Sequence, residues 1–285
     1  MAVDLKEKFF ERGRRSLAAA GMTTANDRAL ICPLCWQETA YEDLSLEHAV
    51  PGSVGGRYTT LTCRRCNNDQ GAALDSHVAN FQTVADAFNG HGTFAVKLNV
   101  NGKRMAADLK WDEGKKDFRV VANASNPNEV AAIWQDFHDG KVAEFAVTVS
   151  FQYAINNFNT ALLRAAYLVL FKCFGYEYTQ HEIIQTLRRR ICDPTLEQPS
   201  LAALMIQLQN GELPHDEPHL VVPGNVNGVE FFLVILRLQK ETTTWRGVFM
   251  PIPGDRESEF FTLMEQCARE HNGERLTLPK EAIFT

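Results

Sequence analysis

Two Cys-x-x-Cys pairs constrain what this chain can fold into more than any other feature. The first pair is Cys32-Pro-Leu-Cys35 and the second is Cys63-Arg-Arg-Cys66, with residues 36–62 between them. Paired knuckles at this separation are a strong signature of a zinc site, because four thiolates can complete a tetrahedral ion. Such an ion holds structure and keeps no open position for chemistry. The alternative is a set of four reduced core cysteines.

The cysteine content and the net charge limit the classes of protein to which this chain can belong. The chain has 285 residues and seven cysteines, and a reducing compartment with a metal site fits the paired four better than a disulfide framework does. The other three, Cys173, Cys192 and Cys267, are expected to be buried fillers. The charged N-terminus lacks a signal core and no apolar run suits a membrane span, so we expect a cytoplasmic protein without membrane contact. The net charge of −6 means that nucleic-acid binding needs local basic patches.

The segment between the knuckles predicts a small ordered unit around the zinc. Residues 44–50 alternate between apolar and polar side chains and lead to Pro51, which predicts a strand. Gly52, Gly55 and Gly56 predict a turn, residues 58–62 a returning strand, and residues 67–78 the start of a helix. Strand, turn, strand and helix follow one another in the order of a ββα-metal nuclease.

The string CPLC…LEHAVPGSVGG…LTCRRCNNDQG…LDSH resembles the HNH (His-Asn-His) endonuclease family, in its four-cysteine zinc-bearing branch. The resemblance covers residues 30–80. It implies that His48 is the general base for the attacking water, and that Glu47 and Asn67 are ligands of a catalytic Mg²⁺ or Mn²⁺. These roles agree with the chemistry, because a scissile phosphate needs a cation and a base that is neutral near pH 7. His77, and also Asp75, are further candidate ligands.

The chain departs from the family pattern at two points. Arg57 and Tyr58 stand where the family has its middle Asn, so the loop that bears the base needs another brace, for which Thr60 and Asn68 are the candidates. Glu47 and His48 are adjacent, and in a regular strand their side chains face opposite sides. Both can serve one site only if the strand twists or breaks near Pro51.

Each assigned residue also has a plainer interpretation. His48 can be a satisfied strand histidine, Asn67 a helix cap, and Asp75 and His77 solvated or supporting side chains. The basic residues beside the module predict contacts with a nucleic-acid backbone; they are Arg57, Arg64 and Arg65. The arginines at 12–15 and 188–190 extend this track or, alternatively, are solvated helix ends.

Outside the module the pattern predicts a mixed α+β remainder. We expect helices over 1–29, 127–138, from 150 to Gly175, over 179–191 with a Thr179–Glu182 capping box, and over 256–271. Extended runs predict a hairpin around Asn101-Gly102, a strand over 116–121 after Glu113-Gly114, and strands over 218–252 with a turn at Asn227-Gly228.

The sequence therefore predicts three regions: an N-terminal helix over 1–29, the zinc-stabilised ββα nuclease module over 30–85, and an α+β region over 90–285 for target recognition, oligomerisation or partner docking. The hypothesis is an HNH endonuclease acting on DNA, with a place in restriction or anti-phage defence suggested by the resemblance. One alternative is a non-catalytic zinc ribbon that binds nucleic acid or protein. Another is an RNase, or a nuclease subunit gated by a separate ATPase.

Overall fold

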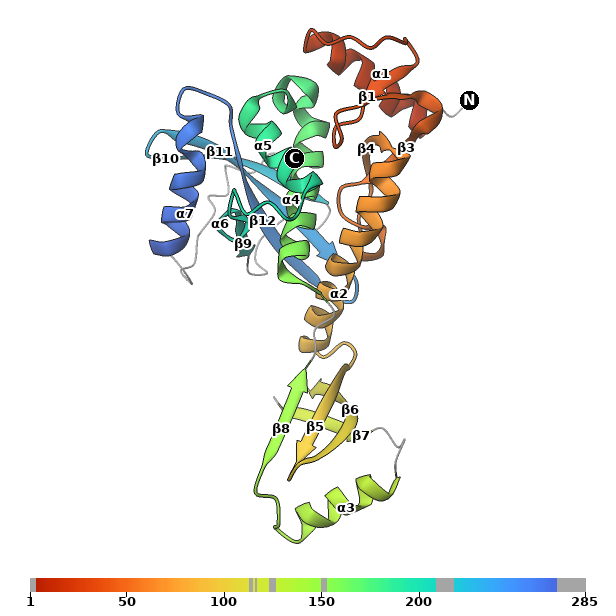
Figure 1. Ribbon diagram of the computed structural model, residues 1–285, viewed down its shortest axis with the longest axis vertical. Helices are drawn as coiled ribbons and strands as arrows, with labels where there is room; N and C mark the ends of the chain where they lie inside the picture. The colour runs from red at the N-terminus through yellow and green to blue at the C-terminus, as the bar shows by residue number, and fades with distance from the viewer. Residues whose placement is uncertain are drawn as a thin grey trace. The chain divides into compact units, whose positions relative to one another are not determined.

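Two compact units make up the chain (Figure 1). The computed structural model describes residues 4–112, 115, 117–122, 127–149, 153–208 and 218–270. The first unit comprises Met1–Ala79, Tyr153–Gln239 and Thr243–Thr285, and the second comprises Asn80–Gln152 and Lys240–Thr242. Among the described residues, no helix is long and apolar enough to cross a membrane.

The cysteine module has the predicted order of elements. The N-terminal elements of the first unit are α1 (Leu5–Ala19), β1 (Ala29–Ile31), β2 (Glu38–Ala40), β3 (Leu44–His48), β4 (Tyr58–Cys63), a π-helical turn (Cys66–Gly71) and α2 (Ala72–Phe88). Strands β1 and β2 form one antiparallel pair, and β3 and β4 form another. Helix α1 ends at Ala19 rather than at residue 29, because Gly21 takes a positive φ of 67° that stops it.

Helix α4 (Ile155–Thr179) and the module share one hydrophobic core. Phe171 and Tyr176 of α4 pack with Phe10 of α1 and with Leu44 and Leu61 of β3 and β4. Each fully buried side chain of this size contributes about 1.5–3 kcal/mol to stability. The module therefore depends on a helix that lies far along the sequence.

Helix α4 bends at Gly175, where the backbone takes a φ of 65°. A Cβ at this position would lie 1.8 Å from Ser16 Oγ, so only glycine allows α1 and α4 to pack this closely. The predicted capping box at Thr179 is wrong. Thr179 is still the last turn of α4 and donates to the Gly175 carbonyl, and α5 (Glu182–Cys192) starts after His181.

The C-terminal part of the first unit is an antiparallel sheet in the order β10-β11-β12-β9. Its elements are α6 (Leu201–Leu204), β9 (Met205–Leu208), β10 (His219–Val226), β11 (Val229–Gln239), β12 (Thr243–Pro251) and α7 (Phe260–Glu270). The predicted turn is present, with positive φ at Asn227 and Gly228. Helix α4 contacts this sheet, and Tyr178 donates a 2.9 Å hydrogen bond to the Pro251 carbonyl.

The second unit is a sheet in the order β7-β6-β5-β8 with one helix. Its elements are β5 (Phe94–Val100), β6 (Lys103–Asp112), β7 (Asp117–Ala122), α3 (Pro127–His138) and β8 (Phe145–Val149). The Asn101-Gly102 hairpin and the 127–138 helix are confirmed, whereas β8 was not predicted. The predicted turn at Glu113-Gly114 lies outside the described residues. Helices and antiparallel sheets together confirm the α+β class.

Candidate zinc centre and active site

The four knuckle cysteines converge on one point. Their sulfur atoms all lie within 4.8 Å of one another, and the Cys35 and Cys63 sulfurs are 3.8 Å apart. Zinc–sulfur bonds of about 2.3 Å in a tetrahedron separate the sulfurs by about 3.8 Å. The cluster therefore has the donor chemistry and the spacing of a structural zinc site.

Hydrogen bonds among the knuckle cysteines shift the pKa values of their thiols in opposite directions. The hydrogen bond with Cys32 lowers the pKa of Cys35 to about 4 and that of Cys63 to about 6, while the pKa of Cys32 itself is raised by its bond to Cys35. Backbone N–H groups also point at sulfur, from Cys63 to Cys32 and from Cys66 to Cys63, each at 3.4 Å. The thiolate form is therefore favoured at Cys35 and Cys63, and two of the sulfurs accept backbone hydrogen bonds.

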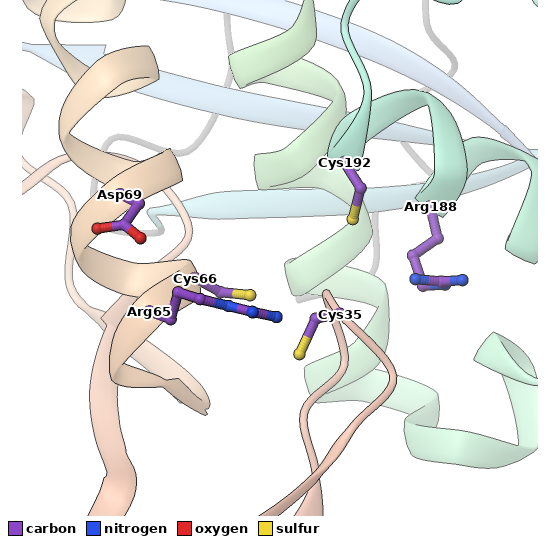
Figure 2. Close-up of a pocket in the computed structure, with 6 residues that line it drawn as sticks. All are labelled: Cys35, Arg65, Cys66, Asp69, Arg188 and Cys192. Carbon is purple, nitrogen blue, oxygen red and sulfur yellow. The ribbon is translucent and has the colours of Figure 1, made fainter.

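A pocket of about 280 Å³ adjoins this centre and is shown in Figure 2. Arg65 lines the pocket, and its side chain points toward Cys35. A hydrogen bond with the Cys35 side chain raises the pKa of Arg65. Arg188 and Cys192 enter from α5, and both donate to the Leu34 carbonyl, at 2.8 and 3.2 Å. These contacts brace the first knuckle, so the pocket belongs to the zinc centre. The other basic candidates are Arg64, which donates to the Glu42 carbonyl at 2.8 Å, and Arg57, which is exposed.

The strand that bears the predicted catalytic pair is irregular between Glu47 and His48. Glu47 pairs with Thr60, but His48 pairs with Tyr58, so Thr59 is an extra residue in β4. This is a β-bulge, which bends the strand and redirects side chains. The irregularity that the sequence predicts near Pro51 is therefore a bulge in β4, opposite the step from Glu47 to His48.

Thr59 braces the turn after His48. Its hydroxyl accepts a 3.2 Å hydrogen bond from the Ala49 N–H and donates to the Arg57 carbonyl at 3.0 Å. The sequence candidates for this brace were Thr60 and Asn68. The residue that makes these contacts is Thr59, which is adjacent to Thr60. A lone threonine carries no sequence signal for such a role, because the bulge that places it depends on strand pairing.

The His48 imidazole is half-buried and lies against the Tyr58 ring, with 4.1 Å between the ring centroids. Burial lowers the pKa of His48 from its ordinary value, although the charge of Glu47 opposes the shift. Among the described residues, neither ring nitrogen of His48 has a hydrogen-bond partner. A Cβ at Gly52 would lie 3.6 Å from Nε2, so glycine keeps that nitrogen accessible. The imidazole is neutral at pH 7 and can accept a proton.

Glu47 is buried, with 2% of its surface exposed, and both of its oxygens are engaged. Thr62 donates to Oε2 at 2.9 Å, and Arg164 Nη2 of α4 lies 3.0 Å from Oε1. Asp75 Oδ1 lies 4.0 Å from Arg164 Nη1 on the other side. Burial raises the pKa of Asp75 to about 6, with Arg164 opposing the shift and Glu47 adding to it. The two carboxylates thus share one guanidinium.

Asn67 and His77, the other two candidate ligands, differ in their hydrogen bonds. Asn67 Nδ2 donates to Ser45 Oγ and to the Leu46 carbonyl, which ties the start of α2 to β3. A Cβ at Gly71 would lie 3.6 Å from both Asn67 Oδ1 and Arg164 Nη2. His77 receives a hydrogen bond from the Ala154 N–H at Nδ1, and its Nε2 lies 2.9 Å from Asn157 Nδ2. With both nitrogens in contact with α4, His77 supports the helix packing.

The donors near Glu47 suit a hard divalent cation. Carboxylate and amide oxygens are provided by Glu47, Asn67 and Asp75, and Mg²⁺ prefers a few such ligands together with waters. A carboxylate can accept about four hydrogen bonds or ligands, so the contacts of Glu47 with Thr62 and Arg164 leave positions for an ion. In the chemistry of their donor atoms, these residues suit a divalent ion.

Sequence reasoning missed Arg164, although a signal was there. It is the only charged residue in the apolar run Ala161–Phe171, and a charge on a buried helix face needs a partner. The sequence alone does not predict that this partner is Glu47, because Glu47 lies in a strand that is distant along the chain.

Comparison with known proteins confirms the resemblance. Residues 32–81 match the HNH endonuclease family. The matched segment contains the four cysteines, Glu47, His48, Asn67 and His77, and it excludes Arg164. No curated protein and no solved structure matches the chain. Over these residues the chain is similar to an endonuclease module.

Proposed function

We propose that the protein is a metal-dependent endonuclease that hydrolyses phosphodiester bonds in DNA. The observation that carries the proposal is the bulged Glu47–His48 step within the family-matched segment. The step joins a half-buried imidazole, whose pKa burial lowers, to the buried carboxylate of Glu47. A purely structural zinc ribbon has no need of this arrangement.

His48 takes the proton of the attacking water. Its ring nitrogens have no hydrogen-bond partner within the part of the chain that the structure describes, and Tyr58 and the Thr59 brace hold the ring and the turn after it. General-base catalysis by a positioned histidine contributes typically about 10²–10⁴ in rate.

Glu47 and Asn67, with Asp75 as an added ligand, would hold Mg²⁺ or Mn²⁺. When bound, the ion supplies charge neutralisation for the phosphorane-like transition state and its leaving oxygen. His77 supports the ligand helix from outside this set, through its contacts with Ala154 and Asn157.

DNA contact falls to Arg57, Arg64 and Arg65, which are all exposed on the module. The overall charge of −6 gives no general attraction to DNA, so these local cations matter for binding. Cys173 is exposed and Cys192 and Cys267 are half-buried, so the expectation that these three are buried fillers is wrong. A cytoplasmic location follows from the paired cysteines as a metal site in a reducing compartment. We place the activity in restriction or anti-phage defence on the resemblance alone. The second unit would supply target choice or docking to a partner protein or a second copy.

Plasmid nicking tests the proposal. Purified protein is incubated with supercoiled plasmid and Mg²⁺ or Mn²⁺, beside His48→Ala and, as a matched control, His91→Ala, which removes an exposed histidine of the second unit. We expect His48→Ala to lose about 100-fold or more in rate and His91→Ala to match the wild type. Equal nicking by His48→Ala and the wild type would refute the catalytic assignment. A parallel reaction on a single RNA transcript separates DNA from RNA cleavage.

One observation favours a second candidate, a non-catalytic zinc module that binds nucleic acid. Both oxygens of Glu47 already have protein partners, Thr62 and Arg164, so the buried carboxylate has its contacts without a metal ion. In that case the protein would retard DNA in a gel without nicking it in either metal, and Arg64→Ala would weaken the retardation.

A further inference from the structure

Arg164 is a buried charge at the centre of the proposed ion site, and it comes from outside the family-matched segment. It lies in the middle of α4 with 1% of its surface exposed. Neighbouring positions on the helix are apolar, from Leu163 to Leu170. Burying a guanidinium in such surroundings is costly unless it is paired and hydrogen-bonded, so its partners reveal its role.

The pairing of Arg164 with Glu47 is not the one that a purely structural ion pair favours. A guanidinium fork typically grips both oxygens of a carboxylate. Here Nη2 lies 3.0 Å from Oε1 of Glu47 as an ion pair, while Thr62 donates to Oε2. Neither Nε nor Nη2 of Arg164 has a hydrogen-bond partner among the described residues. Arg164 is therefore only partly satisfied.

The charges of the cluster do not cancel. Glu47 and Asp75 face the single guanidinium, at 3.0 and 4.0 Å, so the ionised cluster carries one excess negative charge. Asn67 Oδ1 and Arg164 Nη2 both lie 3.6 Å from the position that a Cβ at Gly71 would take. Two carboxylates and one amide oxygen are therefore in the surroundings of this guanidinium.

We propose that Arg164 is the positioning residue of the divalent-ion site: it is the counter-charge of Glu47 in the metal-free protein, and it yields that carboxylate oxygen when the ion binds. The inference rests on the proposed function, which makes Glu47 a metal ligand. Because Arg164 repels a divalent cation, it weakens ion binding until the negative phosphate of a substrate arrives. The site therefore binds ion and substrate together rather than retaining the ion alone.

The test compares Arg164→Met and Arg164→Lys with the wild type, using Arg190→Met as a matched control. Arg190 is also a buried arginine in the same unit, but it contacts Asn156 and has no contact with Glu47. Two readouts are independent of catalysis: the rise of Tm with added Mn²⁺, and Mn²⁺ binding followed by electron paramagnetic resonance. Both start from protein treated with EDTA at a concentration that retains the zinc.

We expect Arg164→Met to melt below the wild type without Mn²⁺, because the two carboxylates then repel each other. Its half-saturating Mn²⁺ concentration should fall by about tenfold. Arg164→Lys keeps the charge and should stay near the wild-type value. Arg190→Met should lose stability with no change in half-saturation. Should the Met variant not fold, Arg164→Gln, which keeps a donor for Glu47, carries the same expectation.

An unchanged or weakened Mn²⁺ affinity in the neutral variants would overturn the inference, as would an equal change in Arg190→Met or a wild type that binds no Mn²⁺. The outcome is separable from the nuclease assay. Nicking by the wild type with no change of Mn²⁺ affinity in Arg164→Met rejects the inference and keeps the nuclease. If Arg164→Met shows the expected change of Mn²⁺ affinity but the wild type does not nick DNA, the inference is kept and the nuclease proposal is rejected.

Discussion

Thr59→Val tests whether the β-bulge positions the base. Thr59 is the extra residue of β4, and it is 4% exposed. Valine keeps the shape of threonine and removes both hydrogen bonds of the hydroxyl, from the Ala49 N–H and to the Arg57 carbonyl. The Ala49 N–H, which directly follows His48, is then left buried without its partner.

The structure sets the size of the effect. Leaving a buried donor unsatisfied costs about 1–3 kcal/mol. At about 2–4 °C of Tm for each kcal/mol in a domain of 150–250 residues, we expect Tm to fall by roughly 2–12 °C. A displacement of about 1 Å at a catalytic group can cost about 10²-fold in rate. Nicking by Thr59→Val should therefore fall by about 10-fold to 100-fold at a temperature where the variant is fully folded.

Thr59→Ser is the matched control, because it restores the hydroxyl and removes only a methyl group. Nicking rates are measured on supercoiled plasmid with saturating Mn²⁺, and Tm by differential scanning fluorimetry. A Thr59→Val protein with wild-type Tm and rate would refute the reasoning, and so would a serine variant as impaired as the valine one.

Two further predictions concern the base and the zinc. Burial lowers the pKa of His48 from 6.5, and the base acts in its neutral form, so the nicking rate should rise with pH, have its midpoint below 6.5 and then level off. A pH–rate profile at saturating Mn²⁺ measures the midpoint, and a value above 6.5 would contradict the assignment. Removing zinc with a chelator leaves thiolates within 4.8 Å of one another, so we expect Tm and nicking to fall together and to return with Zn²⁺ but not with Mg²⁺. A zinc-free protein that nicks at the full rate would disprove the structural role.

Features encoded by adjacent residues were predictable from the sequence. The spacing within and between the cysteine pairs is visible in the sequence itself. The two Asn-Gly turns at 101–102 and 227–228 have the positive φ values that such pairs favour. The helix over 127–138 begins at Pro127, where proline is favoured. In each case the local preference of the residues agrees with the fold, so a short stretch of sequence is enough to predict the element.

Features that depend on distant partners were not predictable. Strands β8 and β9 are short and become strands only by pairing with β5 and β12. The Thr179–Glu182 pattern has the sequence of a capping box, but the packing of α4 extends that helix through Thr179. Thr59 and Arg164 acquire their roles through a bulge and a helix contact that no local pattern specifies.

The same distant contacts explain why the matched segment is not a self-sufficient zinc ribbon. Tyr167 of α4 donates a 2.7 Å hydrogen bond to the Pro33 carbonyl, and Arg188 of α5 satisfies the Leu34 carbonyl. Residues 32–81 without these helices would expose both carbonyls and the apolar faces of β3 and β4, and would leave Glu47 without its counter-charge. A ribbon that serves only as a zinc-stabilised spacer has no use for a buried arginine directed at its strand. Helices α4 and α5 therefore do more than link the module to the rest of the chain, because they complete both its fold and the charge balance of its site.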